Sequence, residues 1–373
     1  MRTLRGNIYT SNCTFEPGEI VIDDKIIKSV KLDTKLNDDE ESIRIIPGLV
    51  DIHSHGCVGH DTCDADPEGL KKMLAYEAAN GITSYLPATM TYSEDILKGI
   101  IRAIVSAKSP VIKGIYLEGP FISAKKKGAQ NEKYIMKPDL EMLRRLQKEA
   151  NGLVKFVAIA PEEEGAMECI RDGRGEFKFS IAHTMADYDT AKGAIANGAN
   201  HITHLYNAMP PYSHRAPGVI GAAADDDSTR VELICDGIHV HDAVIRNTFK
   251  LFGKERVILI SDSMEAAGMP DGTYSLGGQT VIVKDRRAVL ADGTIAGSAS
   301  NLYDCLRHVI EIGVPAETAI AAATINPARE AGISDKTGSI EAGKLSELLI
   351  MDKDYTLKQV IMDESESLCS RSR

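Results

Sequence analysis

The first residues in this sequence that could do chemistry are two histidines, His53 and His55, where a short apolar run stops. Side chains two residues apart on a strand point to the same face. Two imidazoles presented together at a strand end can bind a divalent metal ion, so the first hypothesis is a metal-dependent hydrolase. Taken alone, the stretch is also compatible with an ordinary polar transition from strand to loop.

Further metal-ligand types follow at corresponding places along the chain. Glu118 ends an apolar run just before Gly119-Pro120, and His183 and His204 each end a run of their own. A carboxylate at such a position can bind or bridge metal ions. Each residue alone could be a hydrogen-bonded core residue or a cap, but the set favours a metal centre.

Asp262 ends the last of these runs. A carboxylate there would face the attacking water in a metal-lined barrel, so it is the natural general base, and it could return the proton to a leaving amine. A helix N-cap is the alternative role for Asp262. Arg215 lies in the loop after the sixth run, where a guanidinium suits a bidentate phosphate contact, although most loop arginines are only solvated.

The elements that must position these residues alternate between short β-branched runs and helical patterns. Most of the eight runs end in, or just before, one of the polar residues described above. This organisation is typical of a (β/α)8 barrel, whose active site gathers at the carboxyl ends of its strands. A doubly wound open sheet is the competing fold, because it gives the same alternation. The runs span residues 46–52, 82–87, 112–117, 154–159, 178–182, 201–203, 231–235 and 257–261.

Both ends of the chain have the alternating pattern of antiparallel strands. We therefore predict an α/β protein with two parts. A TIM-like barrel spans residues 47–336 and contains an inserted β-hairpin near 272–294, and a small β-sandwich is built from residues 1–46 together with 337–373. The polar tail from Glu364 onward is expected to fray.

Composition restricts the function classes. The net charge of −11 opposes binding of nucleic acid or an anionic membrane over a broad surface, so an anionic ligand needs a local pocket. Seven cysteines without a Cys-x-x-Cys pair fit reduced thiols. The start of the chain lacks the apolar run of a signal peptide, and no long uncharged apolar stretch follows, so we expect a cytoplasmic protein.

Taken in order, the motifs of this chain resemble those of N-acetylglucosamine-6-phosphate deacetylases in the amidohydrolase superfamily. The segments around Glu118 and His204 are the most specific, whereas the His-x-His pair alone indicates only the superfamily. The matching segments are Pro47-Gly-Leu-Val-Asp-Ile-His-Ser-His-Gly56, Leu117-Glu-Gly-Pro-Phe-Ile122, Lys127-Gly-Ala129, Ala182-His-Thr184, Thr203-His-Leu-Tyr-Asn-Ala-Met209, His214-Arg-Ala-Pro-Gly218, Asp236-Gly-Ile-His239, Ser261-Asp262 and Asp292-Gly-Thr-Ile-Ala-Gly-Ser298.

The resemblance implies hydrolysis of N-acetyl-D-glucosamine 6-phosphate to D-glucosamine 6-phosphate and acetate. The metal would polarise the carbonyl and supply a hydroxide, with Asp262 as the general acid and base. The resemblance also implies a homodimer and one or two divalent ions per chain, zinc or iron first among them. The tightly held ion falls to Glu118, His183 and His204, and the substrate contacts fall on Ala129, Gln130, Asn207, Ala208, Arg215, His239, Ile295, Ala296 and Gly297, of which Arg215 and His239 would bind the phosphate.

Three features are specific to this chain. Some similar proteins lack the His-x-His pair and use one metal, so we predict that His53 and His55 build a second site with Glu118 bridging the two ions. Gln130 stands where many relatives have a histidine thought to polarise the carbonyl; an amide can donate the same hydrogen bond but cannot titrate. The segment from Gly343 to Leu349 departs from the usual pattern, and we expect a consequence for packing rather than catalysis.

Three other functions remain open on sequence grounds. The nearest is a deacetylase of N-acetylgalactosamine 6-phosphate, which differs in the orientation of one hydroxyl. Another is a cyclic-amide hydrolase similar to dihydroorotase, although such enzymes usually bridge their metals with a carboxylated lysine where this chain has Glu118. The third is a non-enzymatic scaffold, which would be expected to have lost several of the ligands retained here.

Overall fold

Eight parallel strands form the central sheet, and they lie side by side in the order in which they occur along the chain. Each run of the sequence that was predicted to be a barrel strand overlaps one of them. Sequential order is that of a (β/α)8 barrel, whereas a doubly wound sheet reverses its strand order partway. The strands are β5 (Leu49–Ser54), β8 (Ile82–Thr89), β9 (Ile115–Phe121), β10 (Val154–Ile159), β11 (Lys178–Ile181), β12 (His201–Ile202), β13 (Arg230–Ile234) and β14 (Val257–Ile260).

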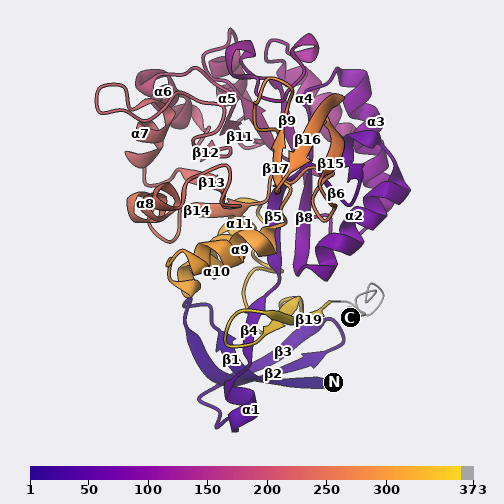
Figure 1. Cartoon of the computed structure of the whole chain (residues 1–373), viewed down its shortest axis with the longest axis vertical. Helices are drawn as coiled ribbons and strands as arrows, with labels where there is room; N and C mark the ends of the chain where they lie inside the picture. The colour runs from indigo at the N-terminus through magenta and orange to yellow at the C-terminus, as the bar shows by residue number, and fades with distance from the viewer. Residues whose placement is uncertain (363–373) are drawn as a thin grey trace.

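The first and last strands meet at their carboxyl ends. The carbonyl of His53 accepts a hydrogen bond from the Asp262 backbone N–H at 2.9 Å, and the His55 N–H donates to the Ser263 carbonyl at 2.8 Å. These bonds close the ring at the end where the polar residues gather. The computed structural model, which describes residues 1–362, thus confirms the predicted barrel (Figure 1).

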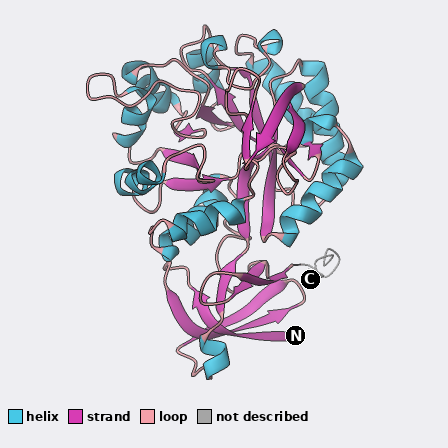
Figure 2. Ribbon diagram, in the orientation of Figure 1, coloured by secondary structure: helices cyan, strands magenta, loops and turns pink. Residues whose placement is uncertain are grey.

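Helices surround the strands on the outside of the barrel (Figure 2). Their apolar positions recur at helical spacing; in α3, for example, Leu97, Ile100, Ile101 and Ile104 are buried on one face. The helices of the barrel are α2 (Pro67–Ala79), α3 (Glu94–Ala107), α4 (Leu140–Glu149), α5 (Ala166–Gly173), α6 (Tyr188–Asn197), α7 (Gly218–Ala224), α8 (Asp242–Phe252), α9 (Leu302–Glu311), α10 (Ala316–Ala323) and α11 (Ile325–Glu330).

Two apolar layers hold the barrel together. One layer fills its interior and includes Ile52, Tyr116 and Phe156, and the larger one lies between the strands and the helices. Ala328 of α11 belongs to the interior cluster, so this short helix covers the end of the barrel opposite the closed carboxyl ends. Among residues 1–362, no helix has both the length and the apolar character needed to cross a bilayer.

Strands from both ends of the chain form the small β domain, as predicted (Figure 1). The two halves of its sheet pack side chains such as Ile8, Ile20 and Leu348 into one shared apolar cluster, which makes the sandwich. The sheet has the order β19 (Leu357–Ile361), β18 (Leu348–Met351), β4 (Arg44–Pro47), β1 (Arg2–Tyr9), β2 (Phe15–Asp23) and β3 (Ile26–Leu32), and α1 (Asp38–Glu41) precedes β4.

We place the domain boundaries near residues 46 and 336 as a proposal. It is supported by β4 and β5, because β4 pairs within the small sheet up to Pro47 and the barrel strand β5 begins at Leu49. The expected polar tail lies outside the described residues.

An antiparallel sheet of three strands occupies the segment in which a hairpin was expected. It consists of β15 (Gly272–Leu276), β16 (Gln279–Lys284) and β17 (Arg287–Val289). Its apolar side contacts Met90 and Met264, which follow barrel strands. A smaller two-stranded sheet, β6 (Gly56–Cys57) with β7 (His60–Asp61), follows β5. Both additions lie next to the carboxyl ends of the barrel strands, and they extend the wall around that opening.

Candidate active site

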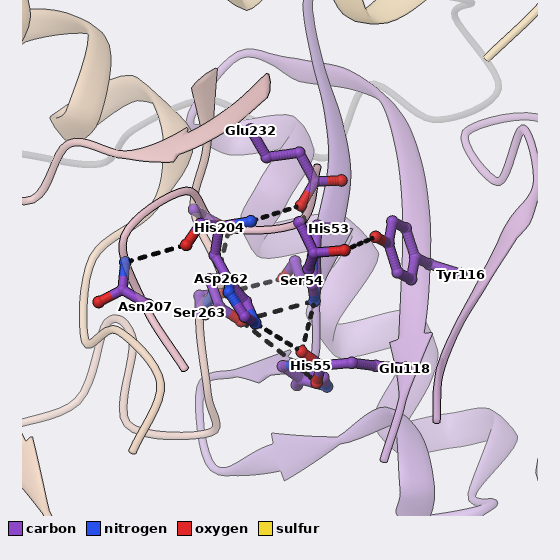
Figure 3. Close-up of polar contacts among 12 residues, drawn as sticks. His53, Ser54, His55, Tyr116, Glu118, His204, Asn207, Glu232, Asp262 and Ser263 are labelled. Atoms are coloured by element: carbon purple, nitrogen blue, oxygen red, sulfur yellow. Dashed lines mark hydrogen bonds and ion pairs between the residues drawn. The ribbon is translucent and has the colours of Figure 1, made fainter. Parts of the chain in front are cut away.

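Four histidines converge on the carboxylate of Glu118. Its Oε1 lies 3.0 Å from the Nε2 atoms of His183 and His204 and 3.6 Å from the Nε2 of His53. Its Oε2 lies 3.1 Å from the Nε2 of His55. All five side chains are buried, and Figure 3 shows Glu118 facing His53 and His55. The structure therefore brings the five predicted metal ligands together, with Glu118 between the two histidine pairs.

The ends of three strands share an uncommon backbone conformation. His183, His204 and Asp262, after β11, β12 and β14, have φ angles of 43°, 29° and 46°. Left-handed φ is uncommon for residues other than glycine and is concentrated at functional sites, where the surrounding structure holds it in place. Here it accompanies the turn of the chain out of the strand, with all three side chains facing the same buried centre.

These residues fit divalent metal ions. Two groups of donor atoms are compact enough to hold one: His53 with His55 and Glu118, and Glu118 with His183 and His204. The Nε2 of His53 is buried and has no hydrogen-bond partner within residues 1–362, as expected of a nitrogen that would bind a metal. Imidazole and carboxylate together suit zinc, iron and similar ions.

The outer ring nitrogens of two ligands are held by protein acceptors. His183 Nδ1 lies 2.9 Å from the carbonyl oxygen of Lys126, and His53 Nδ1 lies 2.9 Å from a carboxylate oxygen of Glu232. A metal-binding histidine commonly donates its other N–H in this way, which fixes the tautomer and the ring orientation. With a metal ion bound, that tautomer would turn the lone pairs of both Nε2 atoms toward Glu118.

Asp262 lies beside this cluster. Its Oδ1 is 3.3 Å from the Nε2 of His55 and 3.7 Å from the Nε2 of His53. Burial by itself raises the pKa of Asp262, but the hydrogen bond with His55 and the charge of His53 lower the pKa below its ordinary value. An ionised carboxylate that borders a cavity and is 8% exposed can accept a proton from water there.

A cavity of about 470 Å³ opens above the cluster. Lys125 and Lys126 border the cavity and place positive charge next to it. Neither residue was predicted from the sequence, where the available signal was the run of three lysines before Gly128. Met90, Leu276 and Thr294 border the cavity as well. The predicted site residues that line the cavity are His55, Glu118, Ala129, Gln130, His183, His204, Asn207, Ala208, His239, Asp262, Ile295 and Gly297.

Three predicted site residues do not border the cavity. His53 and Ala296 are fully buried behind its wall, and Arg215 is exposed on the loop that follows β12. His53 still reaches the metal-ligand cluster through its ring. Arg215 has no contact with this cluster, so its assignment to the phosphate stays a prediction.

Hydrogen bonds fix the orientation of the Gln130 amide. Its Oε1 accepts from the Thr91 backbone N–H at 2.7 Å, and its Nε2 donates to Glu118 Oε2 at 2.6 Å. The N–H group therefore faces the metal-ligand cluster. His239 also lines the cavity, and its Nδ1 contacts Asp236 Oδ2 at 2.8 Å; burial raises the pKa of Asp236, but His239 lowers it to about 2. The Nε2 of His239 is left available to a ligand.

Sequence reasoning did not identify Glu232, the partner of His53. The available signal was a charged residue in the middle of an otherwise apolar strand, Val231-Glu-Leu-Ile-Cys235. Glu232 is fully buried and lies on the side of His53 away from Glu118 (Figure 3).

Comparison with known proteins places this site in a family. Residues 44–367 match the model of the amidohydrolase family. N-acetylglucosamine-6-phosphate deacetylase of Bacillus subtilis is 39% identical, with 93% of this chain and 92% of that protein covered. N-acetylgalactosamine-6-phosphate deacetylase of Escherichia coli O157:H7 is 32% identical, with 85% of each chain covered.

A solved structure resembles the whole fold. It is an aspartate-to-alanine mutant of N-acetyl-D-glucosamine-6-phosphate deacetylase from Mycobacterium smegmatis in complex with N-acetyl-D-glucosamine 6-phosphate. It is 30% identical to this chain and superposes with a TM-score of 0.91, and the match covers 97% of both chains.

Proposed function

This chain belongs to the amidohydrolase family, and on that premise we propose that it hydrolyses N-acetyl-D-glucosamine 6-phosphate to D-glucosamine 6-phosphate and acetate. The observation that carries the proposal is the buried carboxylate of Glu118 between two histidine pairs, with Asp262 beside it at the floor of a cavity. This donor set suits hydrolysis of a carbon–nitrogen bond, because it combines sites for a Lewis acid with a separate proton acceptor.

Glu118, His183 and His204 would hold one divalent ion, and His53, His55 and Glu118 a second; bound there, such ions would polarise the carbonyl and lower the pKa of water. Asp262 accepts a proton as the water oxygen bonds to the acetyl carbon. It then transfers this proton to the sugar nitrogen as the carbon–nitrogen bond breaks, which leaves acetate and a free amine. Gln130, with its N–H held toward Glu118, is proposed to orient the acetyl group.

Cationic and hydrogen-bonding groups of the cavity are proposed to recognise the sugar phosphate. His239 borders the cavity and is oriented by Asp236, and Lys125 and Lys126 add positive charge at its rim. Arg215 is also proposed to bind the phosphate. Sugar contacts are assigned to Ala129, Asn207, Ala208, Ile295, Ala296 and Gly297, most of which line the same cavity.

The decisive experiment measures acetate release by the purified protein. We expect kcat/KM for N-acetyl-D-glucosamine 6-phosphate to exceed that for the unphosphorylated sugar by a wide margin. Absence of acetate release from the phosphorylated sugar, with metal bound, would overturn the proposal.

N-acetylgalactosamine 6-phosphate is the second candidate substrate, supported by the 32% identity to a deacetylase of that name. The two sugars differ at one hydroxyl, so the same metal centre serves both. Side-by-side measurement of kcat/KM decides between them, and a higher value for the galactosamine derivative would reassign the substrate.

Two bound ions per chain are part of the proposal, zinc or iron by donor type. Elemental analysis of the purified protein identifies the metal and its stoichiometry. One metal per chain under saturating metal would contradict the second site at His53 and His55 without affecting the first.

We also propose that the protein is a cytoplasmic homodimer. The dimer rests on the family resemblance. The location is supported by the free thiols of all six cysteines within residues 1–362, since reduced cysteines are typical of the cytosol. Light scattering coupled to chromatography tests the dimer, and a mass equal to one chain would exclude it.

A further inference from the structure

A chain of charged side chains, which begins at the partly exposed Lys178 and is buried beyond it, runs through the barrel interior to the metal-ligand cluster. From the far end, Lys178 Nζ lies 2.8 Å from Glu330 Oε1, which lies 3.0 Å from His201 Nδ1. His201 Nε2 lies 2.8 Å from Glu232 Oε1, and Glu232 Oε2 lies 2.9 Å from the Nδ1 of His53. The chain thus connects α11, at one end of the barrel, with a metal ligand at the other.

Such an arrangement has a high desolvation cost. His53, His201 and Glu232 are all 0% exposed, and a buried carboxylate is tolerated only when donors surround it. Glu232 has three donors, because the His204 backbone N–H also lies 3.2 Å from its Oε2. The carboxylates of Glu330 and Glu232 are paired with Lys178 and His201, so each charged group of the network has a partner.

The outer ring nitrogen of His53 has a different partner from those of the other predicted metal ligands. The Nδ1 of His183 faces a neutral carbonyl, and those of His55 and His204 have no hydrogen-bond partner among the described residues. Within residues 1–362, His53 is therefore the one ligand of the cluster whose outer nitrogen meets a carboxylate. A carboxylate in that position fixes the tautomer and raises the basicity of the ring.

We propose that Glu232 is a positioning residue for the second metal site, which holds the His53 ring with Nδ1–H directed into the barrel and Nε2 directed at Glu118. His201 and Glu330 hold Glu232 in turn. This inference rests on the proposed two-metal centre. It states that Glu232 increases the affinity of the site at His53 and His55 for its metal ion. The ion at Glu118, His183 and His204 is expected to depend on it less, because Glu232 contacts the backbone N–H of His204 and not its ring.

The test is a titration of metal-free protein with Zn²⁺, followed by calorimetry and by elemental analysis after desalting. Wild type is expected to bind two ions. Glu232→Leu is expected to lower the affinity for the second ion by about 10–100-fold, while the affinity for the first ion stays as in wild type. Equal weakening of both ions, or no change in either, overturns the proposal.

Glu232→Gln guards against a variant that simply fails to fold, because the side chain keeps its size. Its amide oxygen can still accept from His53 Nδ1 and the His204 N–H, while its NH2 can donate to a neutral His201. Glu232→Gln is therefore expected to bind the second ion with an affinity between those of wild type and Glu232→Leu. An affinity as low as that of Glu232→Leu contradicts the acceptor role.

Glu330→Gln is the matched control, since it alters the same buried chain one residue further from His53 beyond His201. Its second ion is expected to bind nearly as in wild type, because the amide oxygen can still accept a hydrogen bond from His201 Nδ1 and so keep Glu232 in place. If Glu330→Gln weakens the second ion as much as Glu232→Leu does, the effect is general loosening of the barrel interior and the positioning role is overturned.

The experiment separates this inference from the proposed function. A wild type that binds one ion overturns both the second site and the role of Glu232, whereas deacetylase activity is judged by acetate release. If wild type binds two ions but releases no acetate, the deacetylase proposal fails and the Zn²⁺ affinities still decide the role of Glu232.

Discussion

At the scale of single residues, the two carboxylates of the centre, Glu118 and Asp262, have different surroundings and therefore different roles. Glu118 is enclosed by four histidines, and burial raises its pKa while the histidines lower it well below its ordinary value. Asp262 also lies against histidines but borders the cavity. The first carboxylate is thus placed to bind metal and the second to exchange protons with a ligand.

Asp262→Asn tests the proton-transfer role. We expect kcat to fall by about 10²–10⁴-fold, because an amide of the same size cannot accept the proton. Metal content and the unfolding temperature should stay near those of wild type. Acetate release at a near-normal rate by a correctly metallated variant removes Asp262 from this role.

The lysines at the cavity rim provide a test of phosphate recognition. Lys125→Ala and Lys126→Ala should each raise KM for the phosphorylated sugar, by up to about 10-fold for a lost charge-assisted contact, with little effect on the unphosphorylated sugar. Lys127→Ala is the control, because Lys127 is next in sequence but pairs with Glu132 at 3.7 Å. Equal changes for both sugars would argue against a phosphate contact.

Arg215→Ala extends the same comparison to the exposed loop. The family resemblance predicts a rise in KM confined to the phosphorylated sugar. If KM for that sugar is unchanged, Arg215 has no part in phosphate binding, and the charge comes from the groups that border the cavity.

At the scale of elements, the small β domain is fastened to the barrel by a partly buried charge cluster. Glu347 lies within the segment that departs from the family pattern, residues 343–349. It contacts Lys113 Nζ at 3.0 Å and accepts from the hydroxyls of Thr337 and Thr83 at 2.8 Å and 3.4 Å. Lys113 and Thr83 belong to the barrel side of this contact, so Glu347 joins the two parts of the chain; the packing consequence expected of this segment stays a prediction.

Glu347→Ala should lower the free energy of unfolding by roughly 3 kcal/mol, since it leaves Lys113 partly buried without its partner. Denaturant unfolding measures the change. Asp172→Ala is the control, because the Arg171–Asp172 pair is more than half exposed and its loss should cost under about 1 kcal/mol. Equal effects of the two substitutions would contradict a fastening role for Glu347.

At the scale of the whole molecule, the free energy of unfolding depends on pH through the buried carboxyl group of Glu77 in α2. Glu77 is 0% exposed, and neither carboxylate oxygen has a hydrogen-bond partner within residues 1–362. Burial, and then the nearby charge of Asp51, raise the pKa of Glu77 from 4.5 to about 8. The folded protein therefore holds this proton more tightly than the unfolded chain does, and stability falls as pH rises between these two values.

Glu77→Gln should remove this dependence. The variant is expected to be more stable than wild type at pH 8, by a few kcal/mol at most, with the difference shrinking toward pH 4.5. Denaturant unfolding across this pH range, with metal held constant, provides the measurement. A difference that does not vary with pH would show that Glu77 does not titrate in this window.

Metal removal is expected to destabilise the entire barrel, because the ligands come from strands on opposite sides of the ring. A ligand present at 100 times its dissociation constant stabilises by about 2.7 kcal/mol. Chelator treatment should therefore lower the unfolding temperature by several degrees, and added Zn²⁺ should restore it. An unfolding temperature that chelation leaves unchanged would contradict metal binding at this centre.

Much of this molecule follows from local sequence. The barrel strands were recognisable because their residues are buried on both faces and therefore mainly apolar, with exceptions such as Glu232, and polar residues mark the point where most of the strands end. His53, Glu118, His183, His204 and Asp262 were identified in this way, and the motifs around them indicated the family and the reaction. Parallel strands in one ring bring such ends together whatever the helices between them.

The tertiary structure decided which atoms meet. The bond between His53 and Glu232 joins residues 179 positions apart, and no local pattern encodes it. The direction of the Gln130 amide, the position of Arg215 outside the cavity and the place of Lys126 at its rim depend in the same way on how distant loops pack. Spacing along a strand specifies the face that a side chain occupies, but only the closed barrel sets its partner across the interior, and that partner determines how His53 is held at the centre.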